Sequence, residues 1–300
     1  FGLDRNGSDD PMSRIQAALA AAGEAQIKGK LYEEFEQRRR QQSPWELSLH
    51  ARIDEGLRNG DIWLAFQPQL DIRSGEIKGA EALIRWNDPE RGVIPPDSFI
   101  LQAERAGRIE AITYWVIERA MDASAALTKR GTPLEISVNL SARMVDHPDL
   151  LKRVRQLVAS HRLDPAMMIF EVTETFSMSN RGQAIKNLGG LREMGFRLSI
   201  DDFGTGHASL AYLAEIPSDE IKLDKQFIQR ITTDRRERII VRSIIRLAHA
   251  LGHVVCAEGI EDEHTLVLLR QMNCDIAQGY HIGRPQRLEA LVALMSRDEL

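Results

Sequence analysis

The chain has 300 residues and a formal net charge of −5, and 43% of its residues are hydrophobic. This length suits one barrel of about 250 residues with an additional segment. The slight excess of acidic residues argues against a general DNA- or RNA-binding surface, and only two cysteines exclude a disulfide scaffold. We therefore expect a folded protein in a reducing compartment, the cytoplasm.

The first 45 residues differ from the rest of the chain. Residues 12–29 are rich in alanine with a helical pattern, and residues 31–44 are dominated by charged side chains and glutamine. We predict a helical segment or linker over residues 1–45 and a single barrel domain over residues 46–300. Because the chain starts at Phe1, we expect it to be part of a longer protein. Whether an upstream segment anchors that protein to the inner membrane is left open.

From Trp45 onward, short segments rich in β-forming residues alternate with longer helical stretches. Only residues 71–76 separate the first two strands, which allows a hairpin but no crossover helix. Every later interval has room for a helix, so those strands should pair in parallel. The pattern predicts an α/β fold, a TIM-like (β/α)8 barrel with an antiparallel first strand. The strands are expected at residues 62–70, 77–86, 134–142, 168–175, 197–203, 220–224, 253–258 and 275–280.

Polar residues gather toward the ends of the predicted strands. Because the C-terminal ends of barrel strands converge on one mouth, we expect these side chains to meet in one cleft. Several carboxylates there would repel one another unless cations neutralise them, and oxygen ligands favour Mg²⁺ or Mn²⁺ over zinc. The residues are Glu81, Arg85, Asn139, Glu171, Glu174, Asp201, Asp202, Lys222, Asp224, Glu258, Glu261 and Gln278.

Each of these residues also has a simpler structural interpretation. A single acid at a strand end is often a helix cap, and Asn139 fits turn chemistry. Asp201 and Asp202 could cap a following helix, but adjacent acids also suit two metal ions about 3.5–4 Å apart that act in phosphodiester hydrolysis. His249 and His253 are one helical turn apart, but a glycine between them should end the helix, which argues against a zinc pair.

Eight motifs occur in order along residues 46–298. They are FQPQLD at 66–71, GAEALIRW at 79–86, SVNLSAR at 137–143, FEVTET at 170–175, IDDFGTG at 200–206, IKLDKQFI at 221–228, AEGIE at 257–261 and QGYHIGRP at 278–285. Together they resemble the EAL domains, the cyclic-di-GMP-specific phosphodiesterases. The family fold is a TIM-like barrel with an antiparallel first strand, which agrees with the hairpin inferred above.

The resemblance implies a role for each matched residue. Mg²⁺ or Mn²⁺, expected as two ions, would be bound by Glu81, Asn139, Glu171, Asp201 and Asp202. Glu258 would be a ligand or general base at the metal–water centre, Lys222 the catalytic lysine near the attacking water, and Gln278 its support. The remaining matches are two substrate contacts, Gln67 and Arg85, and Glu174, which would hold the loop over residues 203–210.

The implied activity is the metal-dependent hydrolysis of cyclic di-GMP to linear 5′-pGpG, which lowers the level of this second messenger in bacterial signalling. One alternative is a catalytically weak EAL domain that only senses cyclic di-GMP. Replacement of a metal ligand or of Lys222 would favour that alternative, and here those positions are filled. Another is an enolase-type lyase, which leaves SVNLSAR and QGYHIGRP unexplained.

The resemblance also implies partners. A homodimer through the barrel is expected. Residues 1–45 resemble the tail of a GGDEF domain without its signature glycine-rich loop, so no cyclase activity is expected of them. A sensory or GGDEF domain is expected upstream in the full-length protein.

Overall fold

The computed structural model describes residues 2–3, 33–34, 44–161, 163–173, 180–204 and 215–295. The chain divides into two compact units, Phe1–Glu55 and Gly56–Leu300. In the first unit, β1 (Gly2–Leu3) and β2 (Glu33–Glu34) pair in parallel. The predicted helix over residues 12–29 lies outside the described residues.

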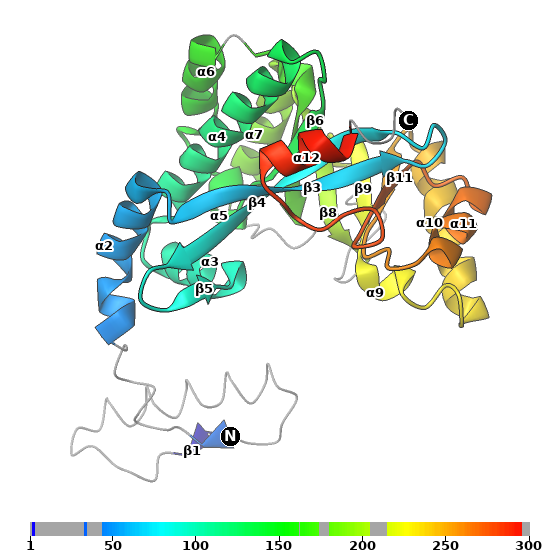
Figure 1. The fold of residues 1–300 in the computed structure, drawn as a ribbon, viewed down its shortest axis with the longest axis horizontal. Coiled ribbons are helices and arrows are strands. Elements are labelled where there is room, and N and C mark those ends of the chain that lie inside the picture. The colour runs from blue at the N-terminus through cyan, green and yellow to red at the C-terminus, as the bar shows by residue number, and fades with distance from the viewer. Residues whose placement is uncertain are drawn as a thin grey trace. The chain divides into compact units, whose positions relative to one another are not determined.

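Eight strands of the second unit form a closed ring. They are β3 (Ile62–Asp71), β4 (Ile77–Asp88), β6 (Glu135–Asn139), β7 (Met168–Thr173), β8 (Arg197–Phe203), β9 (Glu220–Leu223), β10 (Val254–Ala257) and β11 (Ile276–Gln278). Neighbours follow the order β3-β11-β10-β9-β8-β7-β6-β4, and an additional β3–β4 pairing closes the ring (Figure 1). β3 is antiparallel to both neighbours, whereas the other pairs are parallel. The predicted barrel with an antiparallel first strand is confirmed.

All eight predicted strands occur, with ends that differ from the prediction by at most three residues. The short β1 and β2 of the first unit and one strand of the second unit are absent from the prediction. The strand of the second unit is β5 (Gly92–Ile94), which pairs antiparallel with the end of β4 outside the ring. Its three residues begin with a glycine and lie between Pro89 and Pro95, so the local sequence indicates a turn and the strand forms only because β4 offers an edge.

Helices connect the parallel strands. In Figure 1, α4, α6 and α7 lie on one side of the strands and α10 and α11 on the other. Several helices begin at capping residues; for example, the side chains of Asn180, Asp234 and Asp262 accept backbone N–H groups at the first turn. The helices are α2 (Pro44–Asn59), α3 (Pro96–Arg105), α4 (Ile109–Lys129), α5 (Ala142–Val145), α6 (Leu150–His161), α7 (Arg181–Glu193), α9 (Lys225–Ile228), α10 (Arg235–Ala250), α11 (Glu263–Gln271), α12 (Leu288–Met295) and the 3₁₀ helix η2 (Pro165–Met167).

Within the described parts of the chain, we find no helix with both the length and the apolar character that crossing a bilayer requires. The central strands are largely buried, and β8 and β9 alternate between apolar and polar side chains. On β8, for example, Leu198 and Ile200 alternate with Ser199, and all three are fully buried. Because successive side chains of a strand point to opposite faces, one face packs against the helices and the other fills the barrel. The barrel interior is therefore unusually polar.

Candidate functional site

Lys222 of β9 lies at the centre of an acidic cluster inside the barrel. Its ammonium Nζ is 2.7 Å from Glu258 Oε1 and 2.9 Å from Glu171 Oε2. The same nitrogen is 3.3 Å from Glu81 Oε2 and 3.4 Å from Asp201 Oδ1. The Lys222 side chain is only 1% exposed. Five of the residues predicted to converge on the mouth are thus in direct contact.

The pKa of Lys222 lies well above its usual value. Burial alone would lower this pKa, but the carboxylates of Glu171, Glu81, Asp201 and Glu258 outweigh burial. Removing the proton would leave the acids without their cation in a medium of low dielectric constant. Lys222 is therefore a charged ammonium group at neutral pH.

The acids around Lys222 respond differently to burial. Burial and the nearby charge of Glu81 hold the pKa of Glu171 well above its usual range. Burial raises the pKa of Glu258 to about 7, although the charge of Lys222 acts against it. Burial also acts to raise the pKa of Glu81, but Lys222 and hydrogen bonds from side-chain amides bring it below the usual value. Lys222 thus favours the ionised form of all three acids, but only at Glu81, with the help of the hydrogen bonds, does this outweigh burial.

Side-chain amides hold Glu81 in place on β4. Asn139 Nδ2 donates to Glu81 Oε1 at 2.7 Å, and Gln278 Nε2 donates to Glu81 Oε2 at 2.6 Å. Gln69 Nε2 donates in turn to Gln278 Oε1 at 2.9 Å, while Gln278 Nε2 also contacts Gln67 Oε1 at 3.2 Å. Gln69 is missing from the sequence prediction. The sequence feature that would have pointed to Gln69 is its position two residues after Gln67, on the same face of β3.

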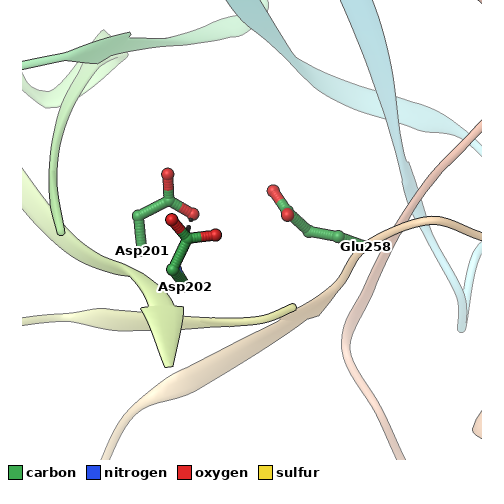
Figure 2. Close-up of side chains that lie close together, drawn as sticks. All are labelled: Asp201, Asp202 and Glu258. Atoms are coloured by element: carbon green, nitrogen blue, oxygen red, sulfur yellow. Dashed lines mark hydrogen bonds between the residues drawn. The ribbon is translucent and has the colours of Figure 1, made fainter. Parts of the chain in front are cut away.

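Asp201 and Asp202 at the end of β8 face Glu258, which follows β10, across the mouth of the barrel (Figure 2). Candidate ligand atoms of the three carboxylates all lie within 4.8 Å of one another. Asp202 has a positive φ of 53°, and its backbone N–H donates to Asp201 Oδ1 at 3.0 Å. Burial and the charge of Asp201 raise the pKa of Asp202. This is the arrangement that a bound cation would stabilise.

The donor set fits divalent cations. Glu171 Oε1 is buried without a hydrogen-bond partner, and such an oxygen is costly unless a donor or a cation satisfies it. The five carboxylates and Lys222 leave a formal charge of −4, which two divalent cations would balance. All ligand atoms are oxygens, which Mg²⁺ and Mn²⁺ prefer. No second group of three such residues at this spacing occurs among the described residues.

Two adjoining clefts open beside the cluster. One, of about 500 Å³, is lined by Gln67 together with Glu81, Asp201, Glu258 and Gln278. The other, of about 590 Å³, runs along β4 and α3 and is lined by Arg85. The two clefts share three lining residues, Glu81, Leu83 and Asp97. The predicted substrate contacts Gln67 and Arg85 therefore face space that a dinucleotide could fill.

The other predicted residues lie at the edge of the cluster or outside the described residues. Asp224 Oδ1 caps α9 by accepting the N–H of Gln226 at 2.8 Å, and the Asp224 side chain also interacts with Asp202. Glu261 is exposed and lines the same cleft as Gln67. Glu174 and most of the loop over residues 203–210 lie outside the described residues. The two histidines considered for zinc have separate partners, since His249 Nε2 contacts Asp275 and His253 Nε2 contacts Ser218.

Residues 50–285 match the family described as EAL domain. A protein of Azorhizobium caulinodans is 41% identical over 252 residues, which cover 82% of this chain and 34% of that protein. The cyclic di-GMP phosphodiesterase NbdA of Pseudomonas aeruginosa is 39% identical over 247 residues, covering 82% of this chain and 32% of NbdA. The chain thus spans about a third of the length of these relatives. The solved structure of the MucR phosphodiesterase of P. aeruginosa in complex with cyclic di-GMP superimposes with a TM-score of 0.76 and 36% identity, covering 81% of this chain and 99% of that one.

Proposed function

Because the chain belongs to the EAL domain family, we propose that it is a phosphodiesterase that hydrolyses cyclic di-GMP to linear 5′-pGpG. The observation that carries this proposal is the cluster of carboxylates around Lys222 at the mouth of the barrel. The relative NbdA is named a cyclic di-GMP phosphodiesterase, and the similar MucR structure contains cyclic di-GMP. In a bacterial cell, the reaction would lower the level of this second messenger.

The proposed cofactor is a pair of Mg²⁺ or Mn²⁺ ions. When bound, the ions supply Lewis acidity that lowers the pKa of a water molecule and stabilises charge on the departing oxygen. Asn139 would contribute its side-chain oxygen, because its nitrogen already donates to Glu81. The proposed ligands are Glu81, Asn139, Glu171, Asp201 and Asp202, with Glu258 as a further ligand or as the base.

Lys222 and Glu258 are the groups proposed to act on the attacking water. Burial acts to raise the pKa of Glu258, which suits a general base, because a base works best when its pKa is close to the working pH. Glu258 Oε1 would take a proton from the water as its oxygen bonds to phosphorus. Lys222 Nζ stays protonated and orients the water and the phosphate. The bond from phosphorus to the 3′-oxygen breaks, and that oxygen takes up a proton, leaving a 5′-phosphate and a 3′-hydroxyl.

Three further residues are proposed to orient the reactants. Gln67 and Arg85 would contact the substrate from the two clefts, and the guanidinium of Arg85 suits an anionic ligand. Gln278 acts indirectly, because its Nε2 donates a 2.6 Å hydrogen bond that holds the metal ligand Glu81 in place. The role of Glu174 in holding the neighbouring loop stays a prediction.

Purified protein incubated with cyclic di-GMP and Mn²⁺, followed by chromatography of the products, tests the proposal. We expect pGpG to accumulate, and excess EDTA to stop it. Absence of pGpG at micromolar enzyme, with the fold intact by circular dichroism, would refute the proposed hydrolysis. Tight metal-independent binding without turnover would favour the sensor alternative.

We also propose that the protein forms a homodimer through the barrel. Helix α10 supports this proposal, because Ile239 and Ile240 on its surface are 56% and 43% exposed. Light scattering coupled to gel filtration tests it, with Ile239→Asp expected to yield monomers. An upstream sensory or GGDEF domain and a cytoplasmic location stay predictions.

A further inference from the structure

Glu220 of β9 is a buried acid that the proposed reaction does not use. It lies two residues before Lys222, so both side chains point into the barrel, and it is only 2% exposed. Ser199 of β8 donates from Oγ to Glu220 Oε1 at 2.9 Å. This hydrogen bond joins β8 to β9 inside the barrel, one layer below the acidic cluster.

Arg197 extends the connection to a third strand. Its Nη1 donates to Glu135 Oε2 on β6 at 2.6 Å, and its Nη2 lies 3.9 Å from Glu220 Oε2. The guanidinium therefore lies between two carboxylates and offsets part of the cost of burying Glu220. Both oxygens of Glu220 are held by neighbours on β8.

The contact between Ser199 and Glu220 lies one residue pair below an irregular part of β8. The two residues are paired in the regular register of β8 and β9, and the register then shifts by one residue before the strand ends. Asp201 and Asp202 occupy this bulge, and the positive φ of Asp202 belongs to it. The bulge allows two consecutive carboxylates to reach the mouth, whereas side chains of a regular strand alternate between faces.

We propose that Glu220, acting through Ser199, is a positioning residue for the metal ligands Asp201 and Asp202. A slip of one residue between two strands exchanges their inward and outward faces, so the regular pairs below a bulge decide where the bulge forms. Ile200 with Ile221 is the last of these pairs, and the buried hydrogen bond fixes the pair before it, Ser199 with Glu220. This inference rests on the proposed function, because it takes the two aspartates as ligands of the catalytic ions.

Titration calorimetry with Mn²⁺ alone tests the inference without relying on catalysis. Glu220→Leu removes the acceptor at similar volume, and we expect Mn²⁺ binding about 10- to 100-fold weaker, the usual effect of losing a group that orients metal ligands. Glu220→Gln keeps an oxygen that accepts from Ser199. Its affinity for Mn²⁺ should stay within about 3-fold of the parent, because the positioning hydrogen bond survives.

Two further variants separate positioning from general destabilisation. Ser199→Ala removes the same hydrogen bond with little change in volume and should also weaken Mn²⁺ binding. This variant provides the test if Glu220→Leu does not fold. Combining both changes should cost no more affinity than Glu220→Leu alone, because they remove one shared contact. The matched control is Asn187→Leu. Asn187 is another fully buried polar residue, and its Nδ2 donates to the backbone carbonyls of Val145 and His147 outside the barrel. This substitution should lower the melting temperature and leave the Kd for Mn²⁺ unchanged.

The outcomes distinguish the positioning role of Glu220 from the proposed function of the protein. A parent protein that binds Mn²⁺, with Glu220→Leu or Ser199→Ala binding equally well, overturns the positioning role alone. An equal loss of affinity in Asn187→Leu also overturns it, because the effect would then follow stability. A parent protein that binds no Mn²⁺ overturns the proposed function and this inference together.

Discussion

Replacing Lys222 with methionine tests the electrostatic balance of the site. Methionine has a similar length, so it fills the space of the lysine while it removes the charge. Lys222 Nζ contacts four carboxylates at 2.7 to 3.4 Å and is only 1% exposed. The Lys222→Met variant would therefore leave these acids in the barrel interior with no cation in contact.

The expected cost follows from this burial. Removing one partner of a buried ion pair typically destabilises a protein by about 3–5 kcal/mol, because the remaining charge is uncompensated. For a domain of this size, each kcal/mol lowers the melting temperature by about 2–4 °C, so we expect a decrease of about 6–20 °C without metal. Divalent cations should recover much of this loss, because a ligand at 100 times its Kd adds about 2.7 kcal/mol of stability.

The assay is thermal unfolding followed by circular dichroism at pH 7.5, first in EDTA and then with Mn²⁺. Lys152→Met is the matched control, since Lys152 is exposed on α6. It should change the melting temperature by no more than about 2 °C. Mn²⁺ should raise the melting temperature of Lys222→Met by more than that of the parent protein. Turnover of cyclic di-GMP by Lys222→Met should fall by about 100-fold or more, while substrate binding is largely spared.

A Lys222→Met protein that melts at the parent temperature in EDTA would refute this reasoning, because the acids would then need no cation. Equal responses of both proteins to Mn²⁺ would refute the idea that ions and lysine balance the same carboxylates. A fall in melting temperature that is the same in Lys152→Met would show that the methionine, and not the lost ion pairs, is responsible.

Three other predictions concern separate parts of the molecule. Asp201→Asn should abolish turnover and weaken Mn²⁺ binding in calorimetry, and unchanged affinity would exclude Asp201 as a ligand. Arg85→Ala should raise KM for cyclic di-GMP by about 10- to 100-fold through the loss of a charge-assisted hydrogen bond, and a selective fall in kcat would place Arg85 elsewhere in the reaction. Burial lowers the pKa of His253 below its usual value of 6.5, so the imidazole is neutral in the folded state. The stability that results from this shift is present above pH 6.5 and is lost as the pH falls through the pKa of the folded state. His253→Gln should show a smaller decrease in melting temperature than the parent between pH 7.5 and 5, and parallel curves would contradict this assignment.

Much of the barrel is determined by local sequence. A buried parallel strand needs a short run of β-forming residues, and a crossover needs enough residues for a helix, so both features are visible along the chain. The six residues between the first two strands already require an antiparallel pair, which β3 and β4 form. The short β5 shows the limit of this reasoning, because three residues carry no periodicity and depend on the exposed edge of β4.

The composition of the site was also readable from the sequence, since carboxylates at strand ends converge in any barrel. Only the tertiary structure decided how they interact. Lys222 meets Glu81, Glu171, Asp201 and Glu258 because the ring of strands closes. The opposite pKa shifts of Glu81 and Glu171 follow from burial and mutual distance. The bulge that presents two adjacent aspartates, and the buried contact of Ser199 with Glu220 below it, depend on the register between two strands. Register arises from pairing between segments distant along the chain, and for that physical reason no local pattern encodes it.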